Sequence, residues 1–370
     1  MDFELTDEQR MLADSLRRYL QEQYTFERRR RIAREGGGFD RAAWSALADM
    51  GVLGLGIDGE YGGFGEGPAS LAVVQHELGR ALVLEPVTAC AVMAAAVIGR
   101  HASAAQKARL LPAIAQGSCI VTPAWLEQGG QAQTRAHRSA EGYVLSGRKT
   151  LVWHGGQADA LLVTVIVEQD DEPSMFLVER AAAGVTTNAY ATLDGMSAAD
   201  LILDNVAVPF DSRIGDEGAG REALQDGLDY GVAALCAEAA GAMERLIEIT
   251  AEYLRTRQQF GRPLGAFQAL QHRMADMVMQ KELAISMAYV AAQALGEDDA
   301  AGRDRKLAAA KFMMAKAAQF VGREAVQLHG GMGMTDELMV GDYFKRLTSL
   351  TVLLGNGDHH LARYAALLEA

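Results

Sequence analysis

Residues 253–264 read YLRTRQQFGRPL, and this stretch shows how the second half of the chain is built. It closes a long helix with an apolar stripe, because Gly261 and Pro263 both interrupt helical backbone. Arg257 therefore stands at a helix C-terminus beside a tight turn, where its guanidinium can pair bidentately with a pyrophosphate. Phe260 can lie against a flat ring. The alternative is that Arg257 serves only as a helix cap.

A second stretch, residues 327–333, reads QLHGGMG and ends another long helix. Gln327 offers both donor and acceptor groups. Gly330 and Gly331 have no Cβ, so their amides can approach a phosphate or an adenosine closely. The alternative is that the glycine pair only stops the helix.

Outward from these stretches, the chain predicts three segments: a helical domain over 1–117, a β domain over 118–212 and a four-helix bundle over 213–370. A capping box at Thr6 opens an expected helix of about seven turns. The strands follow one another without intervening helices, so we expect mainly antiparallel pairing. They are expected at 143–152, 160–167, 175–178 and 201–208. The bundle helices are expected at 221–256, 266–295 and 305–329, with a last helix or pair of helices from 336 to the end.

Composition excludes several classes of protein. The net charge of −13 over 370 residues argues against nucleic-acid binding. The longest apolar run, 87–99, is too short to cross a bilayer, so no membrane insertion is expected. Three cysteines without CxxC spacing indicate reduced thiols in a cytoplasmic protein. The histidines lack ligand partners at metal spacing, so no metal is assigned.

The two stretches, with Phe267-Gln268 and HRMAD at 272–276, resemble the two signatures of the acyl-CoA dehydrogenase family. The helical, β and bundle order matches that family along the whole chain, which implies the acyl-CoA dehydrogenase fold, an α+β multidomain architecture. The resemblance implies FAD as cofactor and an acyl-CoA substrate. The residues that it assigns to FAD binding are Arg257, Gln259, Phe260, Gln327, Gly330, Gly331 and Asn356.

The resemblance also implies a reaction and partners. In this family a carboxylate removes the α-proton of the thioester while the β-hydride passes to the flavin. The half-site formed by the two signatures usually serves the flavin of a neighbouring subunit, which implies an oligomer, commonly a dimer of dimers. Electron-transfer flavoprotein is the implied acceptor.

This chain departs from the family at the catalytic base, which is a glutamate in one of two places. A gapless count from Gln327 puts Leu354 at the late position, and a count back from Arg257 puts Gly231 at the early one. Neither residue can accept a proton. Glu238, on the same expected helix face as Gly231, is a weaker candidate base, and a structural carboxylate is the favoured interpretation of it.

The middle domain also departs from the family pattern. The segment beside the flavin reads TPAWLEQGG at 122–130 instead of a sequence like TEPGAGSD. Trp153 stands where the family has a small hydroxyl residue, and there it would crowd the flavin ring. The favoured alternative makes Trp153 a core aromatic on a strand.

These departures are selective: the half-site lent to a neighbour is present, and the chain's own base is missing. Overall the sequence is most similar to the base-free small subunit of pimeloyl-CoA dehydrogenase-type enzymes. A homologous Glu-bearing subunit is then the expected partner. Two alternatives stay open: a self-sufficient homotetramer that uses an unusual base such as Glu238, and a non-catalytic subunit that binds acyl-CoA or a partner.

Overall fold

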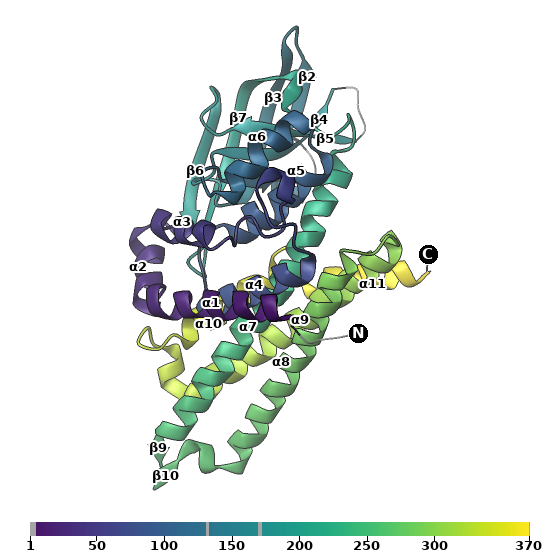
Figure 1. The fold of residues 1–370 in the computed structure, drawn as a ribbon. Helices are drawn as coiled ribbons and strands as arrows, with labels where there is room; N and C mark the ends of the chain where they lie inside the picture. Colours follow the sequence, from purple (N-terminus) through teal and green to yellow (C-terminus); the bar gives the residue numbers. More distant parts are fainter. Residues whose placement is uncertain (1–4, 131–132, 169–171, 370) are drawn as a thin grey trace. The chain divides into compact units, whose positions relative to one another are not determined.

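A computed structural model describes residues 5–130, 133–168 and 172–369 (Figure 1). The chain forms two compact units that alternate along the sequence. One comprises Met1–Arg29, Pro68–Val83 and Val232–Ala370, and the other comprises Arg30–Gly67 and Leu84–Gly231. The elements follow the predicted order of helices, then strands, then helices, which confirms the fold class.

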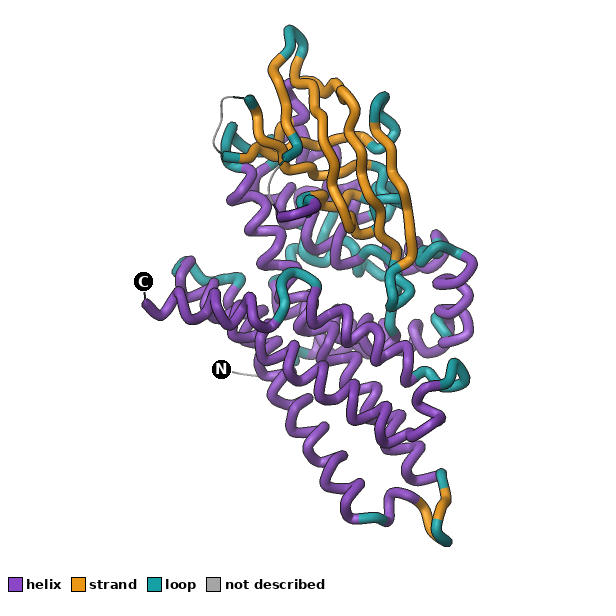
Figure 2. The backbone as a smooth tube through the Cα atoms, turned by 180° about the vertical axis from the view of Figure 1, so that it is seen from behind, coloured by secondary structure: helices purple, strands orange, loops and turns teal. Residues whose placement is uncertain are grey.

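The unit that holds the C-terminal half is helical (Figures 1 and 2). A hairpin of two short strands, β9 (Gln258–Gln259) and β10 (Arg262–Pro263), joins two of its long helices. The last bundle position holds a pair of short helices that both pack against α9. The helices are α1 (Asp7–Gln23), α4 (Pro68–Ala81), most of α7 (Gly220–Thr256), α8 (Gln268–Ala294), α9 (Ala300–His329), α10 (Val340–Val352) and α11 (Gly357–Glu369).

The expected N-terminal helix of about seven turns is wrong. The capping box at Thr6 is present, but α1 has 17 residues and α2 (Phe26–Glu35) begins separately. Tyr24 leaves helical backbone at φ −112° and ψ 54°. The Thr25 hydroxyl then accepts a hydrogen bond from the Arg28 amide at 3.3 Å. A threonine that caps a new helix offers the backbone an alternative to continuing the old one.

The other unit is built on a sheet of eight strands. Seven of them run in the order β6-β7-β3-β2-β4-β5-β8, and β1 pairs with β4. Most pairs are antiparallel, as expected, whereas β1·β4 and β2·β4 are parallel. The strands are β1 (Val121–Ala124), β2 (Arg135–Arg138), β3 (Gly142–Trp153), β4 (Ala160–Val167), β5 (Pro173–Glu179), β6 (Val185–Ala191), β7 (Ser197–Pro209) and β8 (Arg213–Ile214).

The same unit also holds several helices (Figure 2). They are most of α2, α3 (Arg41–Asp49), α5 (Ala95–His101) and α6 (Ala104–Ala115), with a π-helical segment at Val87–Ala94 that packs on β1. Strand β4 is buried at nearly every position, which explains its continuous apolar sequence. No helix in the described ranges has the length and apolarity that a membrane span requires.

Candidate functional site

The two signature stretches meet in the helical unit. The Tyr253 ring near the end of α7 stacks on the His329 imidazole at the end of α9, with centroids 4.3 Å apart and planes at 28°. The Tyr253 hydroxyl donates to the His329 carbonyl at 3.4 Å. These contacts fix the C-termini of two helices that are distant in sequence, so Arg257 and Gln327 belong to one end of the bundle.

The hairpin after α7 turns at Phe260 and Gly261, whose φ angles are 55° and 78°. Two successive positive φ angles between paired strands are the geometry of a type I′ turn. A phenylalanine is unusual there, because left-handed backbone costs a residue with a Cβ about 1–2 kcal/mol. The Phe260 ring is 88% exposed, and its edge meets Phe267 at 6.1 Å between centroids. The turn therefore presents an aromatic side chain to the outside.

The glycine pair has the open backbone that the sequence predicts. Gly330 adopts φ 58° and ψ −139°, a region essentially restricted to glycine. A Cβ built on Gly330 or Gly331 meets no atom of the chain within 4 Å. Gln327, Arg257 and their neighbour Gln259 are exposed. An exposed cation, an exposed amide and unobstructed glycine backbone fit the phosphates of a dinucleotide.

Asn356 does not join this group. It precedes α11, where its side-chain oxygen accepts from the His359 amide at 2.9 Å. A Cβ built on the adjacent Gly357 would lie 3.7 Å from the Ala315 side chain of α9. Ala315 is twelve residues before Gln327, about 18 Å along the helix. Asn356 acts as a helix cap, and its contact with a cofactor stays a prediction.

Leu354, which the count along the sequence puts at the late base position, lies in a turn that buried side chains hold in place. Leu354 and Gly355 both have positive φ, 57° and 98°. Lys311, fully buried on α9, donates to the carbonyls of Leu350 at 2.8 Å and Gly355 at 3.1 Å. His360 donates to the Leu354 carbonyl at 2.9 Å. Three hydrogen bonds from buried side chains thus hold the backbone of this turn, but the leucine side chain at position 354 cannot accept a proton.

Burial sets the charge states beneath this turn. It lowers the pKa of His360 to about 4, so the ring is neutral at pH 7 and its Nε2–H is the donor. Burial also lowers the pKa of Lys311 to about 8. The sequence did not predict the role of Lys311, which stands alone in an apolar helical stretch, and that isolation is the one signal that could have marked it. His360 follows Asp358 and His359, where the sequence favours a solvated helix N-terminus, but the structure buries its ring.

Glu238 is engaged by a partner. Both of its carboxylate oxygens accept from Arg346 of α10, at 2.6 Å from Nε and 2.9 Å from Nη2. Both side chains are buried, 7% and 6% exposed. A bidentate buried ion pair has a structural role that is costly to break, which disfavours Glu238 as a base.

The middle-domain departures lie in the sheet unit. Trp153 at the end of β3 is half-buried and packs edge to face against Trp125, with centroids 6.0 Å apart. The buried Lys149 ammonium pairs with Glu127, whose carboxylate also accepts from the Thr134 hydroxyl at 2.8 Å. This ion pair was missed by the sequence argument. Within the described residues there is no cluster of three or more metal-ligating side chains.

Family models match the chain in three parts: "Acyl-CoA dehydrogenase, N-terminal domain" at residues 6–118, "middle domain" at 128–206 and "C-terminal domain" at 218–368. The chain is 31% identical to acyl-CoA dehydrogenase FadE27 of Mycobacterium tuberculosis, over 98% of this chain and 97% of that one.

Solved structures agree with this. The ChsE4-ChsE5 complex of Mycobacterium tuberculosis matches with a TM-score of 0.91 and 29% identity, covering 100% of this chain and 99% of that one. A glutaryl-CoA dehydrogenase of Mycobacterium smegmatis in complex with FADH2 matches with a TM-score of 0.87 and 25% identity, covering 98% and 95%.

Proposed function

We propose that this chain, which belongs to the acyl-CoA dehydrogenase family, is the base-free subunit of a heteromeric enzyme. Membership of that family makes it an FAD-dependent oxidoreductase of acyl-CoA thioesters. The observation that carries this proposal is Leu354 at the family's late base position. When bound, FAD supplies the acceptor for the substrate's β-hydride. The α-proton must go to a carboxylate, and a homologous partner supplies it.

The neighbouring residues support this proposal. Gly231, at the early base position, has no side chain. Glu238 has both oxygens engaged by Arg346, so it is not available to a substrate while that pair is intact. The pairing favours the heteromer over a self-sufficient homotetramer.

In the proposed assembly, Arg257, Gln259, Phe260, Gln327, Gly330 and Gly331 hold the FAD of the partner subunit. Arg257 faces the pyrophosphate, and the glycine amides approach the adenosine half. Their exposure in the isolated chain supports this role, because such groups are available to a ligand that another chain brings. Asn356 is proposed as a further contact at a separate point. Electron-transfer flavoprotein is the proposed acceptor, and the cytoplasm the proposed location.

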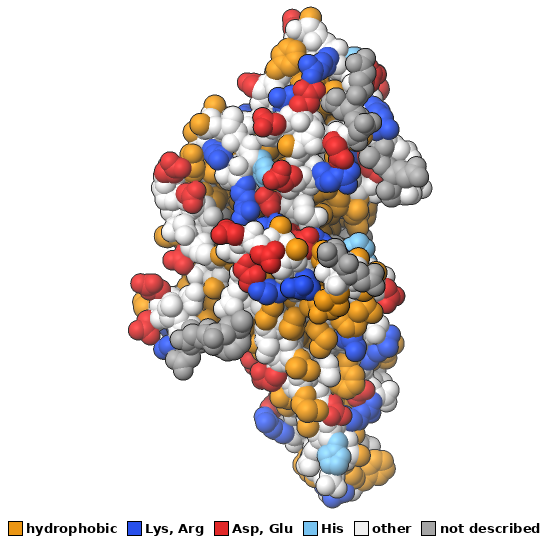
Figure 3. Space-filling model, turned by 90° about the vertical axis from the view of Figure 1, so that its right-hand side faces the viewer, with side chains coloured by type: hydrophobic (Ala, Val, Ile, Leu, Met, Phe, Trp, Pro, Cys, Tyr) orange, Lys and Arg blue, Asp and Glu red, His pale blue; other side chains and the backbone are white. Residues whose placement is uncertain are grey.

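The bundle also carries apolar surface that suits a homologous partner. On α8, Val278, Met279 and Leu283 are 40%, 56% and 47% exposed. Figure 3 shows hydrophobic side chains gathered among charged ones on one face of the bundle. The comparison structure of ChsE4-ChsE5 is itself a complex of two proteins, which is compatible with such a pairing here.

The test is to purify the chain alone and after co-expression with a homologous chain that has glutamate at the turn position. Flavin absorbance and reduction of a dye acceptor by an acyl-CoA series are measured on both. We expect turnover from the mixed complex and none from the single chain. Robust turnover by the single chain would contradict the proposal.

A variant sharpens that test. Leu354→Glu restores a carboxylate on an intact turn, and should give the single chain measurable turnover if FAD is bound. Leu354→Gln has nearly the same shape without a base and is the matched control. Equal turnover by the two variants would show that the observed activity does not depend on a carboxylate at position 354.

A further inference from the structure

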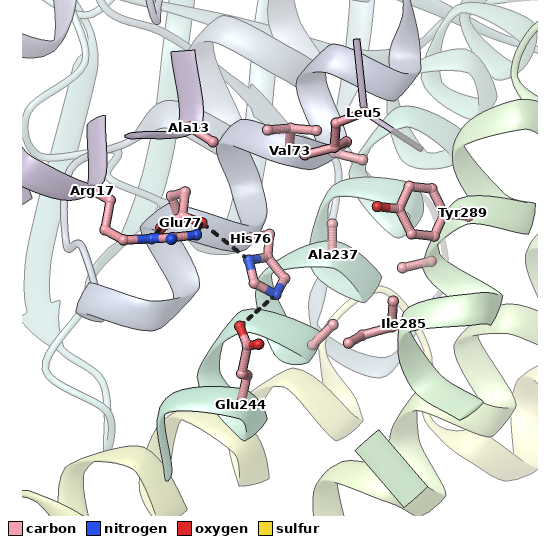
Figure 4. A pocket seen from close by; sticks show the side chains of 13 residues that line it. Leu5, Ala13, Arg17, Val73, His76, Glu77, Ala237, Glu244, Ile285 and Tyr289 are labelled. Carbon is pink, nitrogen blue, oxygen red and sulfur yellow. Dashed lines mark hydrogen bonds and ion pairs between the residues drawn. The ribbon is translucent and has the colours of Figure 1, made fainter. Parts of the chain in front are cut away.

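A recess of about 200 Å³ opens among α1, α4, α7 and α8 (Figure 4), and none of the residues proposed to hold FAD lines it. Small side chains form much of its wall, including Ala13, Ala237 and Ala288. One end is charged: His76 stands between Glu77 and Glu244. This end of the recess therefore places a titratable imidazole between two carboxylates.

Helices α4 and α7 touch through their backbones beside this histidine. A Cβ built on Gly79 of α4 would lie 2.0 Å from the Glu238 carbonyl oxygen. A Cβ on Gly241 of α7 would lie 1.9 Å from the His76 carbonyl oxygen. Because the helices are this close, a charge on one of them acts directly on the other.

Both nitrogens of His76 face carboxylates. Nδ1 lies 3.5 Å from Glu77 Oε1, on the same helix, and Nε2 lies 3.2 Å from Glu244 Oε2, on α7. A neutral imidazole has one N–H and one lone pair, so in either tautomer it turns a lone pair toward one carboxylate. The imidazolium has two N–H groups and satisfies both contacts. The geometry therefore calls for the protonated ring.

The other charges around the ring are paired among themselves. From α1, Arg17 donates two hydrogen bonds to Glu77, at 2.9 and 2.6 Å. From α4, Arg80 binds Glu244 at 2.5 Å and Glu248 at 3.0 Å.

The remaining ionisable groups are more distant. Arg245 of α7 binds Glu248 at 2.8 Å, Asp14 of α1 lies 3.9 Å from Arg17, and Tyr289 of α8 lines the recess. Three guanidinium groups and four carboxylates thus surround the ring, and the proton on His76 adds a further positive charge between α4 and α7.

We infer that His76 is a proton-operated clamp, which holds α4 against α7 when the ring is protonated and releases that contact when the proton leaves. The ring is 23% exposed, so water can exchange its proton. Release turns a lone pair toward Glu77 or Glu244. The contact on that side then becomes repulsive, and α4 loosens at the edge of the recess.

The direction of the pH effect follows from the same groups. Burial acts to lower the pKa of His76, but the contacts with Glu244 and Glu77 outweigh it and raise the pKa above its ordinary value. A raised pKa in the folded chain means that the stabilisation is fully present below about pH 6.5 and is lost as pH rises through the folded-state pKa.

Hydrogen exchange of the full chain tests the clamp. Protection factors of α4 peptides are measured from pH 6 to 9, with β4 peptides as an internal reference. Protection of α4 should fall about tenfold for each unit by which the pKa of His76 exceeds about 6.5. His76→Gln should remove this fall. His272→Gln, on the exposed surface of α8, is the matched control. The same fall in His76→Gln would overturn the proposal.

A second measurement reports the protonation of the His76 ring directly. Two-bond ¹H–¹⁵N spectra of ¹⁵N-histidine-labelled wild-type chain report both ring nitrogens, and the cross-peaks that His76→Gln lacks identify residue 76. A titration midpoint above about 6.5 is expected, and this midpoint should drop in Glu244→Gln. A midpoint at or below about 6.5, or one that does not move in Glu244→Gln, contradicts the clamp.

Discussion

The C-terminal end of α9 and its middle differ in where their polar groups find partners. At the end, Gln327 and the glycine pair face outward. In the middle, Lys311 is buried and donates its hydrogen bonds to the carbonyls of Leu350 and Gly355. The comparison teaches that the exposed polar groups at the end of the helix can serve a ligand, whereas the buried Lys311 holds the backbone of the turn at Leu354. Because backbone carbonyls hold that turn, its side chain at position 354 can change without loss of the turn.

The largest effect is expected when a buried charge loses its partner. Arg346→Met leaves the buried Glu238 carboxylate without its partner, which should cost about 3–5 kcal/mol of unfolding free energy. Urea unfolding followed by circular dichroism measures the loss. Arg323→Met, exposed on α9, is the control and should change stability by less than about 0.5 kcal/mol. Equal effects would remove the distinction between the two classes.

Lys311→Met comes next. It removes the donor to two carbonyls, and we expect a loss of about 2 kcal/mol at pH 7. The pH dependence has a definite sign. Since the pKa of Lys311 is lowered to about 8, the unfolded chain binds more protons between pH 8 and about 10.5, and wild-type stability should rise there.

The methionine variant should lack that rise in unfolding free energy between pH 8 and 10.5. Lys316→Met, exposed one turn further along α9, should keep it. A rise of unchanged size in the Lys311 variant would mean that another group titrates there.

Arg257→Gln tests the exposed polar groups that are proposed to hold FAD. The side chain is exposed, so the free energy of unfolding should change by less than about 0.5 kcal/mol. FAD should bind about 10- to 100-fold more weakly to the complex, because a charge-assisted contact with phosphate is lost. Fluorescence titration with FAD measures this. Arg255→Gln, two residues earlier, is the control, and the two variants should differ clearly in FAD affinity.

The last prediction concerns Leu354→Glu, whose main expected effect is a small change in stability. The turn is held by backbone carbonyls, so an altered side chain at this half-buried position should shift the unfolding free energy by less than about 1 kcal/mol. Thermal unfolding beside Leu354→Gln checks it. A loss as large as that of Lys311→Met would mean that the leucine itself holds the turn.

The sequence predicted the elements whose signals are local. The capping box expected at Thr6 begins a helix in the structure, and the apolar run of β4 is a buried strand. Strand β6 was missed because its side chains are mostly exposed and polar, so it has no apolar alternation to detect.

The site was predictable only in part. Arg257 and Gln327 carry signature patterns, whereas the Tyr253–His329 stack that joins them depends on the packing of two helices. Lys311 and Arg346 contact partners 39 and 108 residues away in sequence, and periodicity carries no information about such pairs. These contacts are tertiary, so a single sequence read by local pattern does not contain them.

The exposed ring of Phe260 has a consequence for the cell. A strained turn that holds an aromatic side chain in water is unfavourable for a chain that works alone. We expect the chain without the proposed partner subunit to associate with itself and to be bound by chaperones or degraded by proteases. Under that proposal, matched synthesis of this chain and its partner would set how much of this chain accumulates.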